Sequence, residues 1–169
     1  MNYLIAGLTA LFPALGMIDS VPVSSGEDDE AVVTRVLTDY YRAFSTLDVQ
    51  AILPYCLEPA LVVSPQGAAA MPTHAALVAA IAPGMEAFRA RGYARSELTM
   101  LHVKRLSAST ALAAGVAVRY KTDGQELDRA GVVYLLQKVD ASWKITVIVV
   151  HDAENRLQLD GGPTITVAV

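Results

Sequence analysis

The stretch that decides the fold is Ser96–His151, SELTMLHVKRLSASTALAAGVAVRYKTDGQELDRAGVVYLLQKVDASWKITVIVVH. Apolar and polar side chains alternate in it between short turns, which is typical of four consecutive antiparallel strands. The dipeptide Asp123-Gly124 favours a two-residue type I′ hairpin, because both residues of such a turn adopt positive φ. This turn sets the register of the two central strands.

The register that follows from this turn pairs oppositely charged side chains, as a correct register tends to do. The predicted cross-strand pairs are Thr122–Gln125, Lys121–Glu126, Arg119–Asp128, Ala113–Tyr134, Lys138–Trp143, Leu136–Ile145, Tyr134–Val147, Ala130–His151, Leu106–Thr110 and Glu97–Arg119. Side chains alternate with period two along a strand. The register therefore predicts that Glu97, Arg119, Asp128 and His151 form a polar row on the face that carries Tyr134.

The opposite face of these strands is also largely apolar. It carries Leu98, Met100, His102, Leu112, Val116, Val118, Leu127, Arg129, Val133, Leu135, Lys144 and Ile148. Such a face is too apolar for open solvent. We expect a second copy of the chain to cover it in a two-fold homodimer, with help from either terminal extension. A register slip of one residue would exchange the two faces.

Helical patterns precede the strands. Val33, Val36, Leu37, Tyr40, Phe44 and Leu47 recur at helical spacing, with Tyr41 on the flank of the same stripe. Asp48 is a good N-cap for a short helix from 49 to 55, and Thr73 caps a third helix. Pro83-Gly84 is expected to kink or break that helix, which Gly92 ends.

Composition indicates one small domain. The chain has 169 residues, 53% of them hydrophobic, a mean hydropathy of +0.38 and a net charge of −4. Lys and Arg form no block or stripe, so a nucleic-acid partner is not expected. The single cysteine, Cys56, excludes an internal disulfide and a multi-cysteine metal site. No two histidines converge in this register, and we expect no metal and no cofactor.

The first 26 residues are an apolar extension. No charged side chain occurs before Asp19, and residues 4–12 resemble the centre of a signal peptide, although no Lys or Arg precedes them. The alternatives are a mistaken start codon or a loosely packed extension, so cytoplasmic and exported locations both stay open. The apolar run is too short for a stable membrane span. We expect the domain over 27–155, and a C-terminal tail or edge strand over 156–169.

Several motifs together carry a family resemblance over residues 31–152. They are Tyr40-Tyr41-Arg42-Ala43-Phe44 followed by Asp48, the strand with Arg119-Tyr120, and the closing Trp143-Lys144-Ile145. With them the chain resembles the nuclear transport factor 2-like superfamily, which includes ketosteroid isomerase and the SnoaL-like polyketide cyclases. It is most similar to small bacterial members of unknown function. The resemblance implies an α+β cone-shaped barrel, in which a strongly curved antiparallel sheet wraps around N-terminal helices.

The cone of that family implies an apolar pocket for a small molecule. In our register Tyr134, Val147, Val149, His151 and Asp128 line the pocket, facing Tyr40, Tyr41 and Phe44 of the first helix. His151 is the candidate proton carrier, supported by Asp128; the alternative is a strand-end histidine bonded to backbone. Arg119 is a candidate for an anionic or carbonyl ligand, or else one member of a structural ion-pair ladder with Glu97. Tyr134 is a candidate hydrogen-bond donor to the ligand.

Two function classes stay open on the sequence. The first is a cofactor-free enzyme that isomerises, dehydrates or hydrolyses a small apolar compound with His151 and Asp128 as the acid-base pair. The second is a non-catalytic ligand-binding or dimerisation module. The isomerase's catalytic aspartate and oxyanion-hole pair have no matching positions in this sequence. The enzyme hypothesis requires the His151 ring to be reachable from the pocket.

Overall fold

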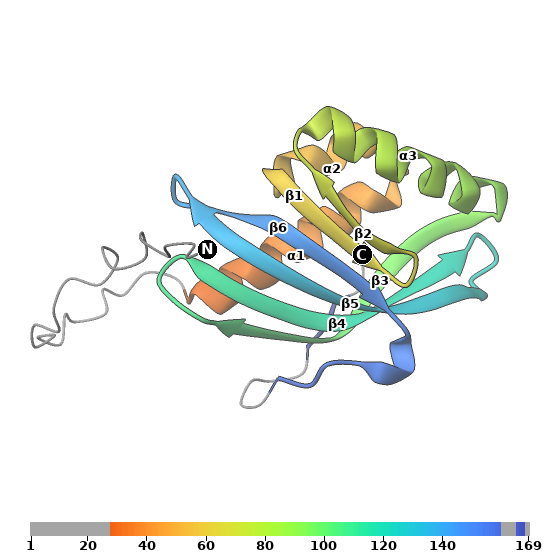
Figure 1. The fold of residues 1–169 in the computed structure, drawn as a ribbon. Coiled ribbons are helices and arrows are strands. Elements are labelled where there is room, and N and C mark those ends of the chain that lie inside the picture. Colours follow the sequence, from red (N-terminus) through yellow and green to blue (C-terminus); the bar gives the residue numbers. More distant parts are fainter. Residues whose placement is uncertain (1–27, 160–164, 168–169) are drawn as a thin grey trace, which may run out of the picture.

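The computed structural model describes residues 28–159 and 165–167 (Figure 1). The apolar extension of residues 1–26, with its predicted signal peptide, lies outside the described residues. The helices are α1 (Asp29–Ser45), α2 (Val49–Ile52) and α3 (His74–Ala90), with short 3₁₀ turns η1 (Leu53–Tyr55) and η2 (Ala153–Asn155). The strands are β1 (Cys56–Ser64), β2 (Gly67–Met71), β3 (Tyr93–Arg105), β4 (Thr110–Lys121), β5 (Glu126–Val139), β6 (Ser142–His151) and β7 (Ile165–Val167).

The strands form one curved, open sheet in the order β2-β1-β6-β5-β4-β3-β7. Helix α1 packs across the concave face, and α3 lies beyond the β1–β2 hairpin (Figure 1). The predicted α+β class is confirmed. The sheet is mixed rather than wholly antiparallel, because β1 runs parallel to β6. The β1–β2 hairpin extends the sheet by two strands beyond the four that the sequence register covers.

The helix starts follow the expected capping rules. Asp28 accepts a hydrogen bond from the backbone N of Glu30, and Asp48 and Thr73 cap α2 and α3 in the same manner. Helix α3 continues through Pro83 as one element and ends before Gly92, whose φ is +77°. The prediction was a kink or a break at Pro83-Gly84, and the helix does not break there. Neighbouring packing on α2 and on the sheet edge holds the helix together despite the missing hydrogen bond.

The turn between β4 and β5 is one residue longer than predicted. Lys121 donates its backbone N–H to Gln125, so Thr122, Asp123 and Gly124 form the loop, with Gly124 at φ +82°. Tyr120 then pairs with Glu126, and Leu127 is an extra residue in β5. This bulge cancels the shift, and Arg119 lies opposite Asp128 as predicted. The predicted pairs Lys121–Glu126 and Thr122–Gln125 are wrong.

A second bulge lies in β3 at Met100, whose φ is +51°. The pairing from Leu106 to His102 follows the prediction, but Thr99 pairs with Val116 and Ser96 pairs with Arg119. Leu98 therefore faces the core instead of the opposite face. Gly115 lies across from the bulge, where an added Cβ would be 3.0 Å from the carbonyl oxygen of Thr99. The bulge thus depends on a residue without a side chain.

A third bulge lies in β6 at Thr146. Leu136 pairs with Ile145 as predicted, but Leu135 pairs with Val147 and Tyr134 with Ile148. Because one extra residue reverses the facing of every later side chain, Ile148 and Val150 point to the concave side, while Val147, Val149 and His151 point away from it.

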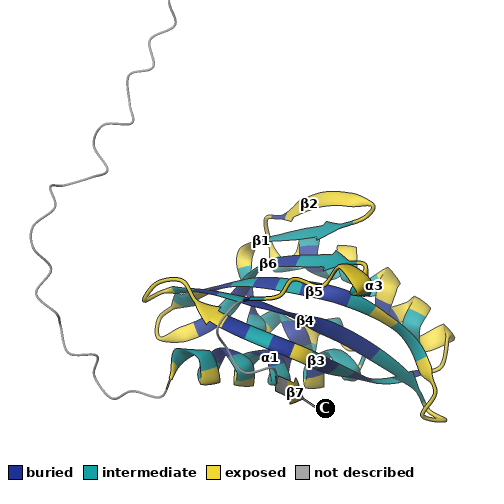
Figure 2. Ribbon diagram, turned by 90° about the horizontal axis from the view of Figure 1, so that it is seen from below, coloured by how far each residue is buried: buried dark blue, intermediate teal, exposed yellow. Residues whose placement is uncertain are grey.

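Small side chains on β4 make room for α1 and for Tyr134. Ala111, Ala113 and Ala117 are all buried at this surface, against Leu37, Tyr40 and Tyr41 of the helix. The other face, called here the convex face, has Val116 and Val118 at 6% and 5% exposure, and part of it is covered by η2 and Arg156. Figure 2 shows the buried residues along β4 and the exposed strand β2 of the β1–β2 hairpin. Among the described residues, no helix is both long and apolar enough to cross a bilayer.

Candidate functional site

A cavity of about 370 Å³ lies between α1, α3 and the concave face of the sheet. Its walls are mostly aromatic and aliphatic. The lining residues are Tyr40, Tyr41, Phe44, Val62, Ser64, Ala80, Ile81, Gly84, Met85, Phe88, Arg119, Val132, Tyr134, Ile148 and Val150. Five of the predicted site residues come together here, namely Tyr40, Tyr41, Phe44, Arg119 and Tyr134.

Helix α3 forms one wall with residues that recur at helical spacing, from Ala80 to Phe88. Two of these positions carry almost no side chain. Ala80 and Gly84 are exposed at the rim, and a Cβ built on Gly84 meets no atom within 4 Å. The gap between α3 and the sheet therefore persists because the helix presents small residues where larger ones would fill it.

The inner end of the cavity holds a buried tyrosine pair. The hydroxyl oxygens of Tyr41 and Tyr134 lie 2.6 Å apart, and their rings meet edge to face. Tyr40 packs against both rings. Burial raises the pKa of Tyr41 to about 12 and raises the pKa values of Tyr40 and Tyr134 well above 10.0. The three phenols therefore stay protonated at neutral pH and act as hydrogen-bond donors or acceptors, not as bases.

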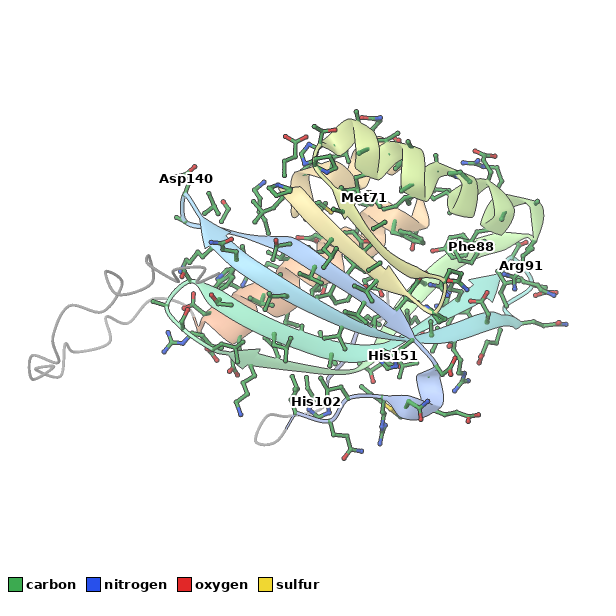
Figure 3. The ribbon with its side chains drawn as sticks, in the orientation of Figure 1. Met71, Phe88, Arg91, His102, Asp140 and His151 are labelled. Atoms are coloured by element: carbon green, nitrogen blue, oxygen red, sulfur yellow. The ribbon has the colours of Figure 1, made fainter. Side chains whose placement is uncertain are left out.

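Arg119 supplies the charge at the other end of the cavity. Its Nη1 lies 2.8 Å from Oδ1 of Asp128, and its guanidinium stacks 4.7 Å from the centroid of the Phe88 ring. Asp128 also accepts a hydrogen bond from Nη1 of Arg91 at 2.8 Å. Figure 3 places Phe88 and Arg91 together at the end of α3. The side chain of Arg119 is 15% exposed and that of Asp128 is 29% exposed, so this ion pair is partly shielded from bulk water.

No Asp, Glu, His, Lys or Cys is among the residues that line this cavity. Within residues 28–159 and 165–167, no group of three His, Cys, Asp or Glu side chains is arranged to hold a metal ion. Arg119 and the three tyrosines are protonated at neutral pH, so none of them is suited to accept a proton from a substrate. The lining therefore consists of apolar surface with one guanidinium and a few hydroxyl groups.

His151 lies on the convex face, contrary to the predicted polar row. It pairs with Gly131, where an added Cβ would collide with the imidazole ring, and its Nδ1 is 2.9 Å from the carbonyl oxygen of Asp152. Figure 3 shows it where β6 ends. Asp128 points to the concave side, so the two side chains are separated by the sheet. The bulge at Thr146 is the physical reason.

Glu97 is also on the convex face, and its predicted pairing with Arg119 is wrong. It binds Arg95 and accepts a hydrogen bond from the hydroxyl of Tyr120 at 3.2 Å. The buried Ser96 takes the place opposite Arg119, where its backbone N–H donates to Oγ of Ser45 in α1. The bulge at Met100 causes this shift. Val147 and Val149, predicted in the cavity, are replaced there by Ile148 and Val150.

Sequence reasoning missed the contribution of α3 and of Arg91. The helical recurrence of Ile81, Met85 and Phe88 was a signal for a buried stripe. It did not say what the stripe faces. Arg91 follows the helix directly, and only the tertiary structure brings it within 2.8 Å of Asp128, which is distant in sequence.

Comparisons with known proteins identify the family of this chain. The profile of the NTF2-like protein (DUF6841) family matches residues 28–153. No curated protein sequence matches this chain significantly.

Solved structures share the fold at low sequence identity. An NTF2-like protein with a cystatin-like fold from Novosphingobium aromaticivorans is 17% identical, with a TM-score of 0.63 over 75% of this chain and 83% of that one. An NTF2-like protein of unknown function from Shewanella oneidensis is 19% identical, with a TM-score of 0.59 over 74% and 100% of the two chains.

A third similar structure is a ketosteroid isomerase-like protein from Erwinia carotovora atroseptica. It is 16% identical, with a TM-score of 0.53 over 79% of this chain and 100% of that one. At these identities the likeness concerns the fold alone. The family match covers most of the chain, from the cap of α1 to the end of β6, and contains every residue that lines the cavity. The chain belongs to the NTF2-like protein (DUF6841) family.

Proposed function

We propose that this protein binds an apolar small molecule in the cavity between α1, α3 and the sheet. The observation that carries the proposal is the cavity itself, about 370 Å³ in volume, with aromatic and aliphatic walls and a few polar groups. Small-molecule sites in proteins have this size and this composition. The tyrosine hydroxyls at one end of this apolar space and Arg119 at the other would fix the orientation of a bound ligand.

Binding without acid-base catalysis fits the lining residues best. An isomerase, dehydratase or hydrolase that moves protons needs a group able to accept one near neutral pH. The cavity wall offers only protonated phenols and a guanidinium for this task. His151, the candidate base, lies across the sheet. These placements support the ligand-binding module over the enzyme that the sequence left open.

The test uses a variant that fills the cavity mouth without harming the fold. Gly84→Leu places a side chain in open space at the rim, and it replaces a poor helix former inside α3. The matched control is Ala79→Leu, which adds the same bulk at an exposed position on the outer side of α3. Both variants should melt at or above the wild-type temperature.

The probe is N-phenylnaphthylamine, an uncharged apolar fluorophore. We expect its fluorescence to rise with wild-type protein and with Ala79→Leu, and its affinity to fall about tenfold or more with Gly84→Leu, because a filled pocket excludes the ring. Isothermal titration then gives the stoichiometry. Equal binding by Gly84→Leu and wild type, or no binding by either, would overturn the proposal.

A further inference from the structure

Arg119 has one hydrogen-bond donor that the protein does not use. Nη1 binds Asp128, and the central carbon of the guanidinium lies over the Phe88 ring, but Nε is buried and has no hydrogen-bond partner among the described residues. A buried N–H of a charged group that lacks an acceptor costs free energy, and such unsatisfied donors are rare in native structures. Arg119 lines the cavity, so a ligand oxygen that draws Nε toward the cavity would supply the missing acceptor.

The charges at this end of the cavity do not cancel. Arg119 and Arg91 share the single carboxylate of Asp128, so the three side chains carry a net charge of +1. The neighbouring arginines do not change this sum. Arg95 is paired with Glu97, and Arg129 with Glu126, both on the convex face. An excess of one positive charge at this end of the cavity favours a ligand that brings one negative charge.

The tyrosine pair supplies no negative charge to balance Arg119. Burial keeps both hydroxyls protonated, and Arg119 lowers the pKa of Tyr41 and Tyr134 too little to reverse this. Two hydroxyls that share one hydrogen bond use one of their two protons, so the second is also available to an acceptor. The cavity lining therefore carries one cationic group, hydroxyl groups and no anionic group, with apolar walls between them.

We propose that the ligand is an apolar monocarboxylate, whose carboxylate accepts a hydrogen bond from Nε of Arg119 while its body fills the space between α1 and α3. This inference rests on the proposed function and names the chemical class of its ligand. A neutral ketone or amide would satisfy the Nε donor but would leave the excess positive charge unpaired.

The experiment compares acids with their uncharged amides on the same apolar body. Decanoate, phenylbutyrate and naphthoate, each beside its primary amide, compete for the site occupied by N-phenylnaphthylamine. We expect at least one acid to displace the probe about tenfold or more better than its amide, since a charged hydrogen bond contributes about that much. An amide that competes as well as its acid in every pair would overturn the inference and leave apolar binding intact.

Two variants separate the effect of the Nε hydrogen bond on ligand affinity from the effect of the positive charge that Arg119 and Arg91 both carry. Arg119→Met removes the donor, while Asp128 keeps its bond to Arg91. Arg91→Met removes the same amount of charge and leaves Nε of Arg119 in place. We expect Arg119→Met to remove the preference for the acid, and Arg91→Met to reduce it only about threefold, because this outer charge is screened by water. Equal losses in the two variants would contradict a role for Nε.

The probe makes the two failures distinguishable. N-phenylnaphthylamine has no charge, so its Kd in each variant reports the apolar cavity apart from the preference for the acid, which is the ratio of acid to amide affinity within that variant. Melting temperatures near wild type show that each variant is folded. Failure of wild-type protein to bind the probe, the acids and the amides would overturn the proposed function and this inference together.

Discussion

The hydroxyl of Tyr41 on α1 lies 2.6 Å from the hydroxyl of Tyr134 on β5, inside a core that is otherwise apolar at this point. This bond joins the helix to the centre of the sheet and closes the inner end of the cavity. Neither tyrosine has another partner of this kind in the described residues, so each hydroxyl depends on the other for its hydrogen bond.

Removing one of these hydroxyls should therefore cost more than removing both. We expect Tyr134→Phe to lower the free energy of unfolding by about 1–2 kcal/mol, because the Tyr41 hydroxyl is left buried without a partner. Tyr41→Phe should behave alike. The double variant should be no less stable than either single variant. Urea unfolding of the four proteins measures this coupling, and additive losses would contradict it.

His151 should not matter for binding, because the sheet separates it from the cavity. We expect His151→Ala to bind N-phenylnaphthylamine with an unchanged Kd and to remain folded. Arg119→Met serves as the comparison for acidic ligands. A large loss of affinity in a folded His151→Ala protein would mean that the ligand lies on the convex face, near Asp152 and Glu154.

Asp29 should make stability depend on pH. Its Oδ1 is 2.9 Å from Nζ of Lys138, and its Oδ2 is 3.2 Å from Nη1 of Arg105. The hydrogen bond from Lys138, aided by Arg105 and Trp143, lowers the pKa of Asp29 below its usual 3.8. A carboxyl with a lowered folded-state pKa stabilises the protein above its unfolded pKa, and this contribution is lost as pH falls through the folded pKa.

Asp29→Asn should therefore be less stable than wild type by about 1 kcal/mol at neutral pH. The difference should shrink as the pH falls below about 4. Urea unfolding at several pH values measures it. Asp140→Asn is the control, since Asp140 is an exposed turn residue with φ +50°, a conformation that asparagine tolerates. A difference between Asp29→Asn and wild type that grows on acidification would contradict the role of Asp29.

The convex face should hold a second copy of the chain. Val133, Leu135, Val147 and Val149 are only partly buried there, beside the buried Val116 and Val118. We expect a two-fold dimer in solution, measured by size-exclusion chromatography with light scattering. Val133→Glu should give a folded monomer, because it places a charge in the apolar contact, whereas Val133→Thr of similar shape should remain largely dimeric. A wild-type monomer at micromolar concentration would contradict this arrangement.

The sequence by itself determined the fold class, the number and order of the long strands and the capped helices, whereas the predicted pairing of Arg119 with Asp128 occurs because the bulge at Leu127 offsets the longer turn. These features follow from local rules: alternation along strands, helical recurrence from Val33 to Phe44, and the preferences of Asp48, Thr73 and Gly124. It also predicted that four aromatic residues line the cavity, namely Tyr40, Tyr41, Phe44 and Tyr134. The first three lie in helix α1, and Tyr134 lies in the regular part of β5, so no bulge changes the direction in which they point.

Only the tertiary structure decided which end-of-strand residues face the cavity. One extra residue at Met100 and one at Thr146 reverse the facing of Glu97 and His151. The bulge at Met100 needs Gly115 on the neighbouring strand, because an added Cβ there would lie 3.0 Å from the carbonyl oxygen of Thr99. That condition depends on contacts between distant segments, as does the meeting of Arg91 with Asp128, so no local pattern in the sequence reveals it.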